Sequence, residues 1–377
     1  MAGELTERDL LHLQRTVELA EGGRGRVSPN PLVGAVIARD DGFLGEGFHA
    51  ELGGLHAERA ALADARDRGH DPAGATAYVS LEPCAHLGRQ PPCTDALIEA
   101  KVARVVYLAD DPSEKASGRG PALLREAGIE VTPANSSAAA TARLQNQPFR
   151  KHARSGRPLV ILKSAVSLDG RTATGSGDSR WISGAESRAL VHAWRADADA
   201  VAVGVGTALA DDPLLTARDV VAAPSRQPLR IVFDSQARLP LDSALVGSLS
   251  EAPVLVIAGA DAPGEPLAAL REAGVDVFVA EGRGADVVSA ALAELGRRGV
   301  TSLLLEGGAG LAGSFLDAGE IDELRLFVAP ILVGGENARP LLTGSGAGLI
   351  AEARRALAVE HERVGDDVMI HARIQEW

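Results

Sequence analysis

The first patterned stretch of the chain runs from Glu7 to Ala20 and places apolar residues three or four positions apart. This spacing is that of one face of an amphipathic helix. Two short apolar runs follow, Val33–Arg39 and Phe43–Phe48, on either side of Asp40-Asp41-Gly42. Apolar runs that flank an Asp-Gly pair predict a β-hairpin. The N-terminal half therefore opens with a helix and a hairpin.

Helical and extended patterns then alternate. An Ala-rich stretch from His56 to Arg68 predicts a helix closed by Gly69, and Thr94–Ala100 predicts a second, shorter helix. Thr76–Leu81 and Ala103–Ala109 have the length and composition of strands. Strands that alternate with helices predict an α/β sheet covered on its faces.

The pattern changes between Asn135 and Pro158. This stretch holds an Ala-rich helical piece and then a basic segment with Gly and Pro, so we place the domain boundary near Arg150–Gly156. Two α/β domains are predicted, residues 1–150 and residues 151–377, and the chain is long enough for both. In the second domain the alternation restarts with the runs PLVILKSAV, DAVAVGVG, LRIVFDS, APVLVIAG, VDVFVA, SLLLEGG and ELRLFVAPILVG.

Composition narrows the class of partner. Hydrophobic residues make up 46% and charged residues 24% of the chain, as in globular proteins. The formal net charge of −13 argues against a non-specific grip on nucleic acid or anionic membrane, and is compatible with a small-molecule substrate. No apolar run approaches the roughly 20 residues of a membrane helix, and the charged MAGELTERDL lacks the apolar region of a signal peptide. We expect a cytoplasmic protein.

Both cysteines of the chain lie in one stretch, SLEPCAHLGRQPPC, and each follows a proline. They could form a disulfide, which reduced cytoplasmic thiols disfavour, or be core thiols, or bind a metal. An H-x-E motif, His56-Ala57-Glu58, upstream of a Pro-Cys pair matches the zinc nucleobase deaminases. Zinc would take His56, Cys84 and Cys93 and keep a fourth position for water. Glu58 would carry protons between that water and the substrate nitrogen.

Positions i and i+2 of a helix point roughly 200° apart, so His56 and Glu58 reach one site only if it lies beyond the helix N-terminus. Cys93 starts another predicted helix, and a metal between two helix N-termini meets this condition. A structural zinc would instead need a fourth protein ligand, for which His86 or His49 is available.

A second motif lies in the C-terminal half. Gly308–Gly313 reads G-x-G-x-x-G between a predicted strand and a predicted helix, where backbone amides suit a pyrophosphate. A Rossmann fold also expects an acidic residue at the end of the next strand, and FVAPILVGG has none. The pattern therefore disfavours a Rossmann fold and still allows dinucleotide binding.

The runs NPLVGAVI, HAE and EPCAHLGRQPPC together resemble the deaminase half of the bifunctional riboflavin biosynthesis deaminase/reductase family, which has the same long spacing between its cysteines. DPSEKASGRG also resembles a segment of that family. Gln90, Ser113 and Glu114 depart from the family pattern, and none of them is a candidate metal ligand. The resemblance implies a cytidine-deaminase-like three-layer α/β/α domain, with Asn30 and His49 near the pyrimidine. Asn30 could also be a turn residue between two prolines.

LKSAVSLDGRTA, SGDSRWISG and VGVGTALADDPLLTAR resemble the reductase half of the same family. They imply a dihydrofolate reductase-like α/β domain that uses NADPH. The implied substrate contacts are Ser179, Arg195, Leu215, Arg218 and Glu306. The implied NADPH contacts are Ala165, Trp181, Thr207, Asp211, Ser235, Gly308, Ala309, Gly310, Leu311, Ala312, Gly313 and Ser314.

The chemistry of these side chains supports the implied roles to different degrees. Arg195 and Arg218 can hold a ribose phosphate bidentately in an acidic protein. Lys163 and Glu306 occupy strand positions that border the site, and we nominate both as catalytic residues for the ring-opened sugar; a structural ion pair is the alternative. Trp181 could equally belong to the core.

The two resemblances cover nearly the full chain and imply one bifunctional enzyme with Zn²⁺ and NADPH as cofactors. It would hydrolytically deaminate 2,5-diamino-6-ribosylamino-4(3H)-pyrimidinone 5′-phosphate and then reduce the ribosyl group to a ribityl chain. We expect a homo-oligomer. The alternatives are a nucleic-acid base deaminase, which would need a basic face, and a protein in which zinc only stabilises a loop.

Overall fold

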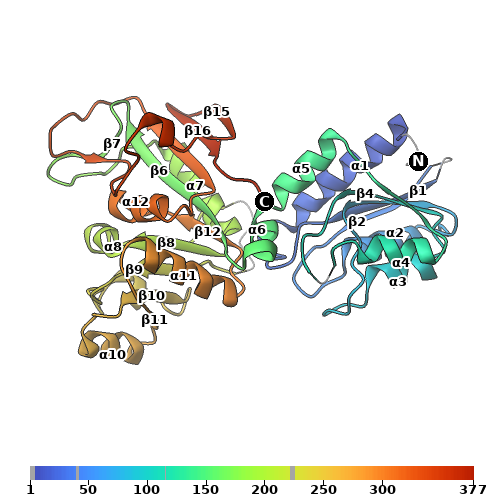
Figure 1. Ribbon diagram of the computed structural model, residues 1–377, viewed down its shortest axis with the longest axis horizontal. Coiled ribbons are helices and arrows are strands. Elements are labelled where there is room, and N and C mark those ends of the chain that lie inside the picture. The colour runs from blue at the N-terminus through green and yellow to red at the C-terminus, as the bar shows by residue number, and fades with distance from the viewer. Residues whose placement is uncertain (1–4, 40–41, 115, 221–225) are drawn as a thin grey trace. The chain divides into compact units, whose positions relative to one another are not determined.

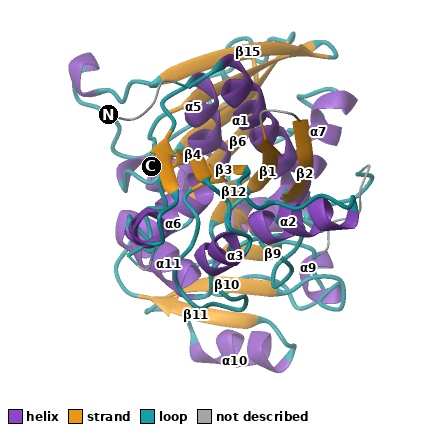
Figure 2. Cartoon of the chain, turned by 90° about the vertical axis from the view of Figure 1, so that its right-hand side faces the viewer, coloured by secondary structure: helices purple, strands orange, loops and turns teal. Residues whose placement is uncertain are grey.

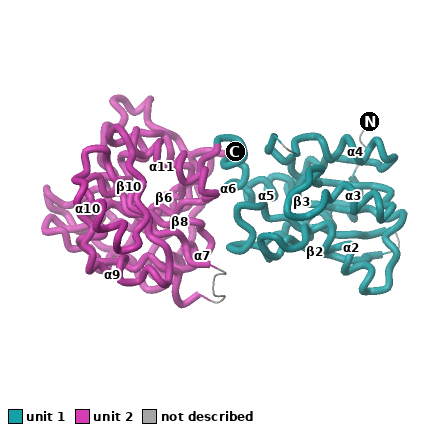
Figure 3. Tube along the Cα trace, turned by 90° about the horizontal axis from the view of Figure 1, so that it is seen from below, with its two compact units in different colours: residues 1–155, 377 teal, residues 156–376 magenta. Residues whose placement is uncertain are grey.

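The chain divides into two compact units in the computed structural model, which describes residues 5–39, 42–114, 116–220 and 226–377 (Figures 1 and 3). The first unit comprises Met1–Ser155 together with Trp377, and the second comprises Gly156–Glu376. The boundary predicted at residue 150 falls inside helix α6 (Gln147–Ser155), because its proline, Pro148, lies in the first turn, where it does not interrupt a helix, and Gly156 lies beyond its end. Asp40 and Asp41, the predicted hairpin turn, lie outside the described residues.

The first unit is a five-stranded sheet between two layers of helices. Its strands follow the order 2-1-3-4-5, in which strands 2 and 3 are antiparallel to strand 1 and strands 3, 4 and 5 are parallel. Besides α6, its elements are α1 (Glu7–Ala20), η1 (Glu21–Gly23), β1 (Gly34–Arg39), β2 (Gly42–Phe48), α2 (Ala57–Asp67), β3 (Thr76–Leu81), α3 (Cys93–Glu99), β4 (Arg104–Ala109), α4 (Arg119–Glu126), β5 (Glu130–Pro133) and α5 (Ser137–Gln145).

The three layers follow from the alternation of side chains along the strands. Ala35 and Ile37 of β1 pack in one cluster with α2, α3 and α4, whereas Val36 and Ala38 pack in another with α1 and α5. Figure 1 shows these two helical layers on opposite faces of the sheet. A sheet buried on both faces needs strands that are apolar throughout, which is the pattern of β1.

Two glycines of β2 determine how closely α2 approaches the sheet. A Cβ atom at Gly45 would lie 2.5 Å from the backbone nitrogen of Ala65, and one at Gly47 would lie 2.5 Å from that of Ala61. Carbon atoms do not approach backbone nitrogen so closely, so only glycine allows this packing. The close approach of α2 fixes the position of its N-terminus, which begins directly after His56.

The second unit is built on a nine-stranded mixed sheet with a separate two-stranded pair. The strand order in the large sheet is 11-10-9-8-12-6-13-16-15; all neighbours from 11 to 13 are parallel, and 16 and 15 are added antiparallel. Its elements are β6 (Leu159–Ser167), β7 (Arg171–Ala173), α7 (Ala185–Asp197), β8 (Ala200–Gly204), α8 (Val205–Asp211), β9 (Leu229–Phe233), α9 (Ala244–Gly247), β10 (Val254–Gly259), α10 (Gly264–Glu272), β11 (Asp276–Ala280), α11 (Ala285–Arg297), β12 (Ser302–Leu305), α12 (Ala309–Asp317), β13 (Glu323–Ala329), β14 (Arg339–Pro340), η2 (Ile350–Glu352), β15 (Ala358–Val364) and β16 (Asp367–Arg373).

The core of the second unit lies between the parallel strands and helices α11 and α12, around Phe315. Helix α10 lies beside the edge strand β11, as Figures 1 and 2 show. Each of the apolar runs expected in this half contains a strand. The hairpin of β15 and β16 has no counterpart in the sequence-based expectations, because β15 is mostly exposed and lacks an apolar face. Among the described residues, no helix is long and apolar enough to cross a bilayer.

Candidate functional site

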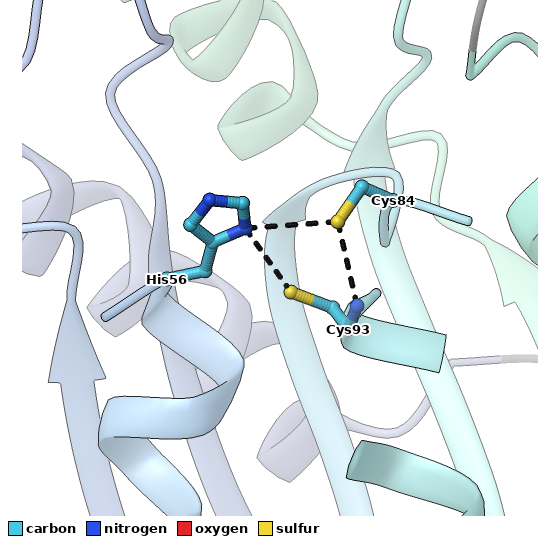
Figure 4. A group of neighbouring side chains, drawn as sticks. All are labelled: His56, Cys84 and Cys93. Atoms are coloured by element: carbon cyan, nitrogen blue, oxygen red, sulfur yellow. Dashed lines mark hydrogen bonds between the residues drawn. The ribbon is translucent and has the colours of Figure 1, made fainter. Parts of the chain in front are cut away.

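His56, Cys84 and Cys93 come together at the carboxyl end of β3. His56 is the N-cap of α2, Cys93 is the first residue of α3, and Cys84 lies in the loop after β3. The Nδ1 atom of His56 lies 3.6 Å from the Cys84 sulfur and 3.3 Å from the Cys93 sulfur (Figure 4). Three ligand atoms, one from each residue, lie within 4.8 Å of one another, and both cysteines are free thiols.

The chemistry of this cluster fits a zinc ion. The Cys93 thiol, the His56 ring and the backbone N–H of Cys93 all hydrogen-bond to the Cys84 sulfur and lower the pKa of Cys84 to about 4. Cys84 is therefore a thiolate, the form that binds metal. Two sulfur atoms and one imidazole are ligands that zinc takes in tetrahedral sites. Within the described part of the chain the cluster holds three such ligands, as a catalytic rather than a closed structural site does.

Glu58 lies in the first turn of α2 and is 4% exposed. Burial and the negative charge of Cys84 together raise the pKa of Glu58 to about 7. The carboxyl group also hydrogen-bonds with Cys93. Residues two apart reach the same site because His56 has the extended backbone of an N-cap and makes no side-chain capping bond, so its ring is available to the cluster. A buried carboxyl group with this pKa can gain and lose a proton at neutral pH.

A cavity of about 340 Å³ opens beside the cluster. Asn30, His49, His56, Glu58 and Cys84 line it, so the structure brings together most of the residues nominated for this half. The His49 Nδ1 atom lies 2.9 Å from the carbonyl oxygen of Leu55, and its Nε2 atom lies 3.1 Å from the Asn30 amide nitrogen. Both ring nitrogens of His49 are thus occupied within the protein, and burial lowers the pKa of His49. His49 is therefore not a fourth metal ligand.

Several lining residues were not among the sequence-based candidates. The sequence could have pointed to some of these lining residues, because His86, Arg89 and Gln90 lie in the same short loop as the cysteines. Gln90, which departs from the family pattern, donates to the carbonyl oxygen of Gly53 at 2.9 Å and so ties two loops of the cavity together. The other lining residues outside the prediction include Glu82, Asp111, Ser113 and Phe149, which come from the ends of β3 and β4 and from α6.

A second cluster of charges lies in the second unit, at the end of β12. Glu306 accepts hydrogen bonds from Nε and Nη2 of Arg195, at 2.6 and 2.9 Å, and lies 3.9 Å from the Lys163 ammonium group. Burial alone would raise the pKa of Glu306, but Arg195 and Lys163 outweigh it and hold that pKa below the ordinary value. Burial lowers the pKa of Lys163. The fork of Arg195 thus binds Glu306, and its expected role in holding a phosphate stays a prediction.

The loop after α8 packs against this cluster. The Nη1 atom of Arg195 donates to the carbonyl oxygen of Thr216 at 3.3 Å, and the backbone N–H of Arg218 donates to His192 Nδ1 at 3.3 Å. Leu215 between them is buried, and its φ of 55° is a conformation that non-glycine residues rarely adopt. The structure therefore brings Arg195, Leu215, Arg218 and Glu306 into one region, and their role as substrate contacts stays a prediction. His192 belongs to this group and was not predicted.

The segment before α7 contains Ser179 and Trp181. Trp181 is 69% exposed, so it is not a core residue, and the Arg188 guanidinium lies 4.7 Å from its ring centre. Arg180 donates to the carbonyl oxygen of Asp211 at 2.8 Å, which brings this segment next to the end of α8. Two candidate cofactor contacts from distant parts of the sequence, Trp181 and Asp211, therefore lie near one another.

The glycine-rich run forms the N-terminus of α12, and its N-cap, Gly308, makes no side-chain capping bond. A Cβ atom at Gly308 would lie 3.6 Å from the Thr207 hydroxyl oxygen, whereas one at Gly310 would project into open space. Free backbone N–H groups beside a hydroxyl fit a phosphate of a dinucleotide. Ala312 and Gly313 are instead buried, because Ala312 packs in the hydrophobic core and Gly313 lies against the backbone of Thr343.

The remaining candidates lie farther along the sheet. Ser235 is exposed at the end of β9, two strands away from β12. Ala165 is half-buried on β6 and pairs in register with Phe327 of β13. Ala309, Leu311 and Ser314 belong to α12, where all three are partly exposed.

Comparison with known proteins assigns each unit to a family. Residues 6–109 match the cytidine and deoxycytidylate deaminase zinc-binding region, and residues 158–370 match the RibD C-terminal domain. The riboflavin biosynthesis protein RibD of Actinobacillus pleuropneumoniae is 40% identical, over 97% of this chain and 95% of that protein. The RibD protein of Escherichia coli K12 is 39% identical, over 97% of this chain and 99% of that protein.

Solved structures give the same result. RibD from Acinetobacter baumannii superposes with a TM-score of 0.85 at 36% identity, over 98% of this chain and 99% of that one. A diaminohydroxyphosphoribosylaminopyrimidine deaminase/5-amino-6-(5-phosphoribosylamino)uracil reductase from Thermotoga maritima has a TM-score of 0.84 at 33% identity, over 97% and 99% of the two chains. The expected fold class and the two expected cofactors are confirmed. Both halves match along nearly their full length, and the chain therefore belongs to the RibD family of bifunctional riboflavin biosynthesis enzymes, which join a zinc-dependent deaminase domain to an NADPH-dependent reductase domain.

Proposed function

We propose that the first unit deaminates 2,5-diamino-6-ribosylamino-4(3H)-pyrimidinone 5′-phosphate and that the second unit reduces the ribosyl group of the product to a ribityl chain. The observation that carries the first half is the buried Glu58 beside His56, Cys84 and Cys93 at the wall of a cavity. The name of the Thermotoga maritima protein supports the choice of substrate and the order of the two steps.

In the deaminase unit, His56, Cys84 and Cys93 would hold zinc. When bound, zinc supplies the positive charge that activates water for attack on a ring carbon that bears an amino group. Glu58 takes up a proton on its carboxylate oxygen and returns it to the leaving nitrogen, for which a pKa of about 7 is well matched. Ammonia leaves and the ring carbon becomes a carbonyl.

Asn30 and His49 would orient the pyrimidine. Because the Asn30 amide nitrogen lies against Nε2 of the neutral His49 ring, its amide group is held in one orientation toward the cavity. Arg89 is exposed at the cavity wall and carries five N–H donors in a fork that suits a phosphate. We assign the substrate phosphate in this unit to Arg89.

In the reductase unit, NADPH would be held by Ala165, Trp181, Thr207, Asp211, Ser235 and the Gly308–Ser314 run, and when bound it supplies a hydride for C1′ of the open-chain sugar. Lys163 would donate a hydrogen bond, and then a proton, to the sugar chain. Glu306 keeps Lys163 charged through the ion pair between them and orients Arg195, from which it accepts hydrogen bonds. Arg218, whose side chain is exposed, would meet the phosphate beside Ser179 and Leu215.

The protein would work in the cytoplasm, in keeping with the reduced thiols of its metal site. It would also assemble into a homo-oligomer. Large exposed apolar side chains of the second unit support self-association, because unpartnered apolar surface of this kind is common at interfaces. Light scattering coupled to size-exclusion chromatography measures the assembly directly, and a monomer at all concentrations would contradict it. The exposed residues include Ile331, Leu332, Leu349, Ile350, Leu357 and Val359.

The test of both activities is one assay with two signals. Purified, zinc-loaded protein is supplied with the diaminopyrimidine ribosylamino phosphate and NADPH, and ammonia release and loss of NADPH absorbance are followed together. We expect both signals, with ammonia appearing first. Ammonia without NADPH oxidation would overturn the second half of the proposal, and silence in both channels would overturn the substrate.

A further inference from the structure

Trp377 follows β16 in the sequence, yet it is part of the first unit. Its backbone N–H donates to the Gln147 side-chain oxygen at 2.7 Å. Its carbonyl oxygen accepts from Nε of Arg150 at 2.7 Å and from the Gln147 amide at 3.2 Å. The Lys151 ammonium group lies 5.2 Å from the centre of its ring, a cation–π contact. Three residues of α6 therefore bind Trp377 through its backbone and its ring.

All three of these residues are buried, with exposures of 3% for Gln147, 2% for Arg150 and 1% for Lys151. Polar groups so far from solvent need partners, because a buried donor left without one costs more than the bond contributes. Trp377 supplies such a partner to Gln147 and to Arg150. The position of α6 therefore depends on a residue more than two hundred positions further along the chain.

Helix α6 in turn forms part of the cavity that contains the zinc cluster. Phe149, which lies between two of the residues that bind Trp377, lines that cavity. On its other side, Arg150 donates to the backbone carbonyl of Asp110 at 2.8 Å and to the Asp110 carboxylate at 3.1 Å. The next residue, Asp111, is buried and also lines the cavity. One arginine thus links Trp377 to the segment that carries Asp111.

We infer that Trp377 is a positioning residue for deamination: through Gln147 and Arg150 it holds the Phe149 and Asp111 side of the substrate cavity in place. The inference rests on the proposed function of this cavity. Trp377 is not one of the residues that line the cavity, so its loss should alter substrate binding and leave the chemical step intact. The deaminase site is therefore completed by a residue that follows the whole reductase unit in sequence.

The experiment compares four forms of the full chain: wild type, a form that lacks only Trp377, Trp377→Ala and Trp377→Phe. Trp377→Ala keeps the backbone bonds and removes the ring, while Trp377→Phe keeps a flat ring over Lys151. Glu376→Ala is the matched control, because Glu376 is the exposed neighbour of Trp377 and forms an ion pair with Arg373. Ammonia release gives kcat and KM, and NADPH oxidation with the deaminated intermediate measures the reductase alone.

We expect the loss of Trp377 to raise the KM of deamination by about fivefold, the effect of losing roughly one ordinary hydrogen bond, with kcat changed less than twofold. Trp377→Ala should give a smaller rise, Trp377→Phe should restore the KM, and Glu376→Ala should match wild type. An unchanged KM in the form without Trp377 would overturn the inference. So would a parallel fall of both activities with loss of zinc and of thermal stability, since that indicates a purely structural role.

Hydrogen exchange makes the inference testable without substrate. Amides of residues 110–113 and 147–155 should exchange faster when Trp377 is absent, while those of α2 should keep the wild-type rate. Equal exchange at residues 110–113 in both forms would also overturn the inference. If wild-type protein releases no ammonia, the proposed substrate is what fails, and the exchange comparison still decides whether Trp377 holds the cavity wall.

Discussion

Two buried glutamates, one in each unit, have opposite electrostatics. Burial raises the pKa of Glu58 to about 7, with the nearby charge of Cys84 acting in the same direction. Glu306 has a side chain that is 9% exposed, and Arg195 and Lys163 hold its pKa below the ordinary value. The difference lies in the partners, since burial penalises the charged form in both cases. Glu58 is therefore suited to moving a proton, whereas Glu306 is a permanent anion that holds two cations.

The two sites also differ in how the sequence supplies them. In the first unit, His56, Glu58, Cys84 and Cys93 come from two short motifs at the starts of α2 and α3. In the second unit, the residue that binds both oxygens of Glu306 is 111 positions away from it in sequence. The metal ligands of the first site come from local motifs, although Trp377 supports one wall of its cavity, whereas the second site brings together charges from distant strands and depends on the whole sheet. The following predictions test this contrast.

Removal of zinc should have the largest effect. Dialysis against a chelator should abolish ammonia release, because the cluster of the first unit loses the ion that activates water. The reductase should keep its activity on the deaminated intermediate, which NADPH absorbance measures. Added zinc should restore ammonia release. A parallel loss of NADPH oxidation would show that the two sites are not separate.

Glu58→Gln should lower the kcat of deamination by about a thousandfold, the range expected when a general acid–base group is lost. Zinc content and thermal unfolding should match wild type, because the amide fills the same volume beside the cluster. The control is Glu51→Gln, an exposed glutamate of the same unit. If Glu58→Gln also loses its zinc, the carboxylate acts on the metal site and not on the proton.

Glu306→Gln should lower kcat/KM for reduction by about a hundredfold and leave deamination unchanged, because Arg195 and Lys163 lose the anion that places them. Breaking a buried ion pair on one side should also destabilise the second unit by about 3 kcal/mol at pH 7. Denaturant unfolding followed by circular dichroism measures this. Loss of ammonia release in the same variant would contradict the independence of the two sites.

The stability part of this prediction has a pH dependence with a definite sign. The folded-state pKa of Glu306 is lowered from 4.5, so the carboxylate stabilises the fold above that value and its contribution is lost as the pH falls below it. The difference in unfolding free energy between wild type and Glu306→Gln should therefore shrink on acidification below about pH 4.5. A difference that grows on acidification would mean that Glu306 is not held as an anion.

Gly47→Ala should give the smallest effect of the four, a loss of about 2 kcal/mol in the stability of the first unit, because the added carbon would overlap the backbone of α2. The shift of α2 should also weaken zinc binding, since His56 caps that helix. Gly264→Ala is the control, because a Cβ there meets nothing within 4 Å. Equal unfolding midpoints for the two variants would show that α2 can move without cost.

The elements and the first site were largely predictable from the sequence because their signals are local. Helix α1 and strand β3 have the bounds that periodicity predicts, and the metal cluster draws on motifs whose spacing is typical of a zinc site. The hairpin of β15 and β16 was missed for the opposite reason, since its side chains are too exposed to leave an apolar pattern. Lining residues such as Phe149 and Asp111 carry no motif that points to the cavity.

By itself, the sequence determined two α/β units and a zinc ligand set and predicted a glycine-rich dinucleotide contact, because each depends on residue types at short spacings. Only the tertiary structure decided which charges meet. It paired Arg195 with Glu306 where the sequence suggested a phosphate, and it placed Trp377 on α6. Such contacts cannot be predicted from spacing along the chain, because the packing of strands and helices decides which distant residues meet in space.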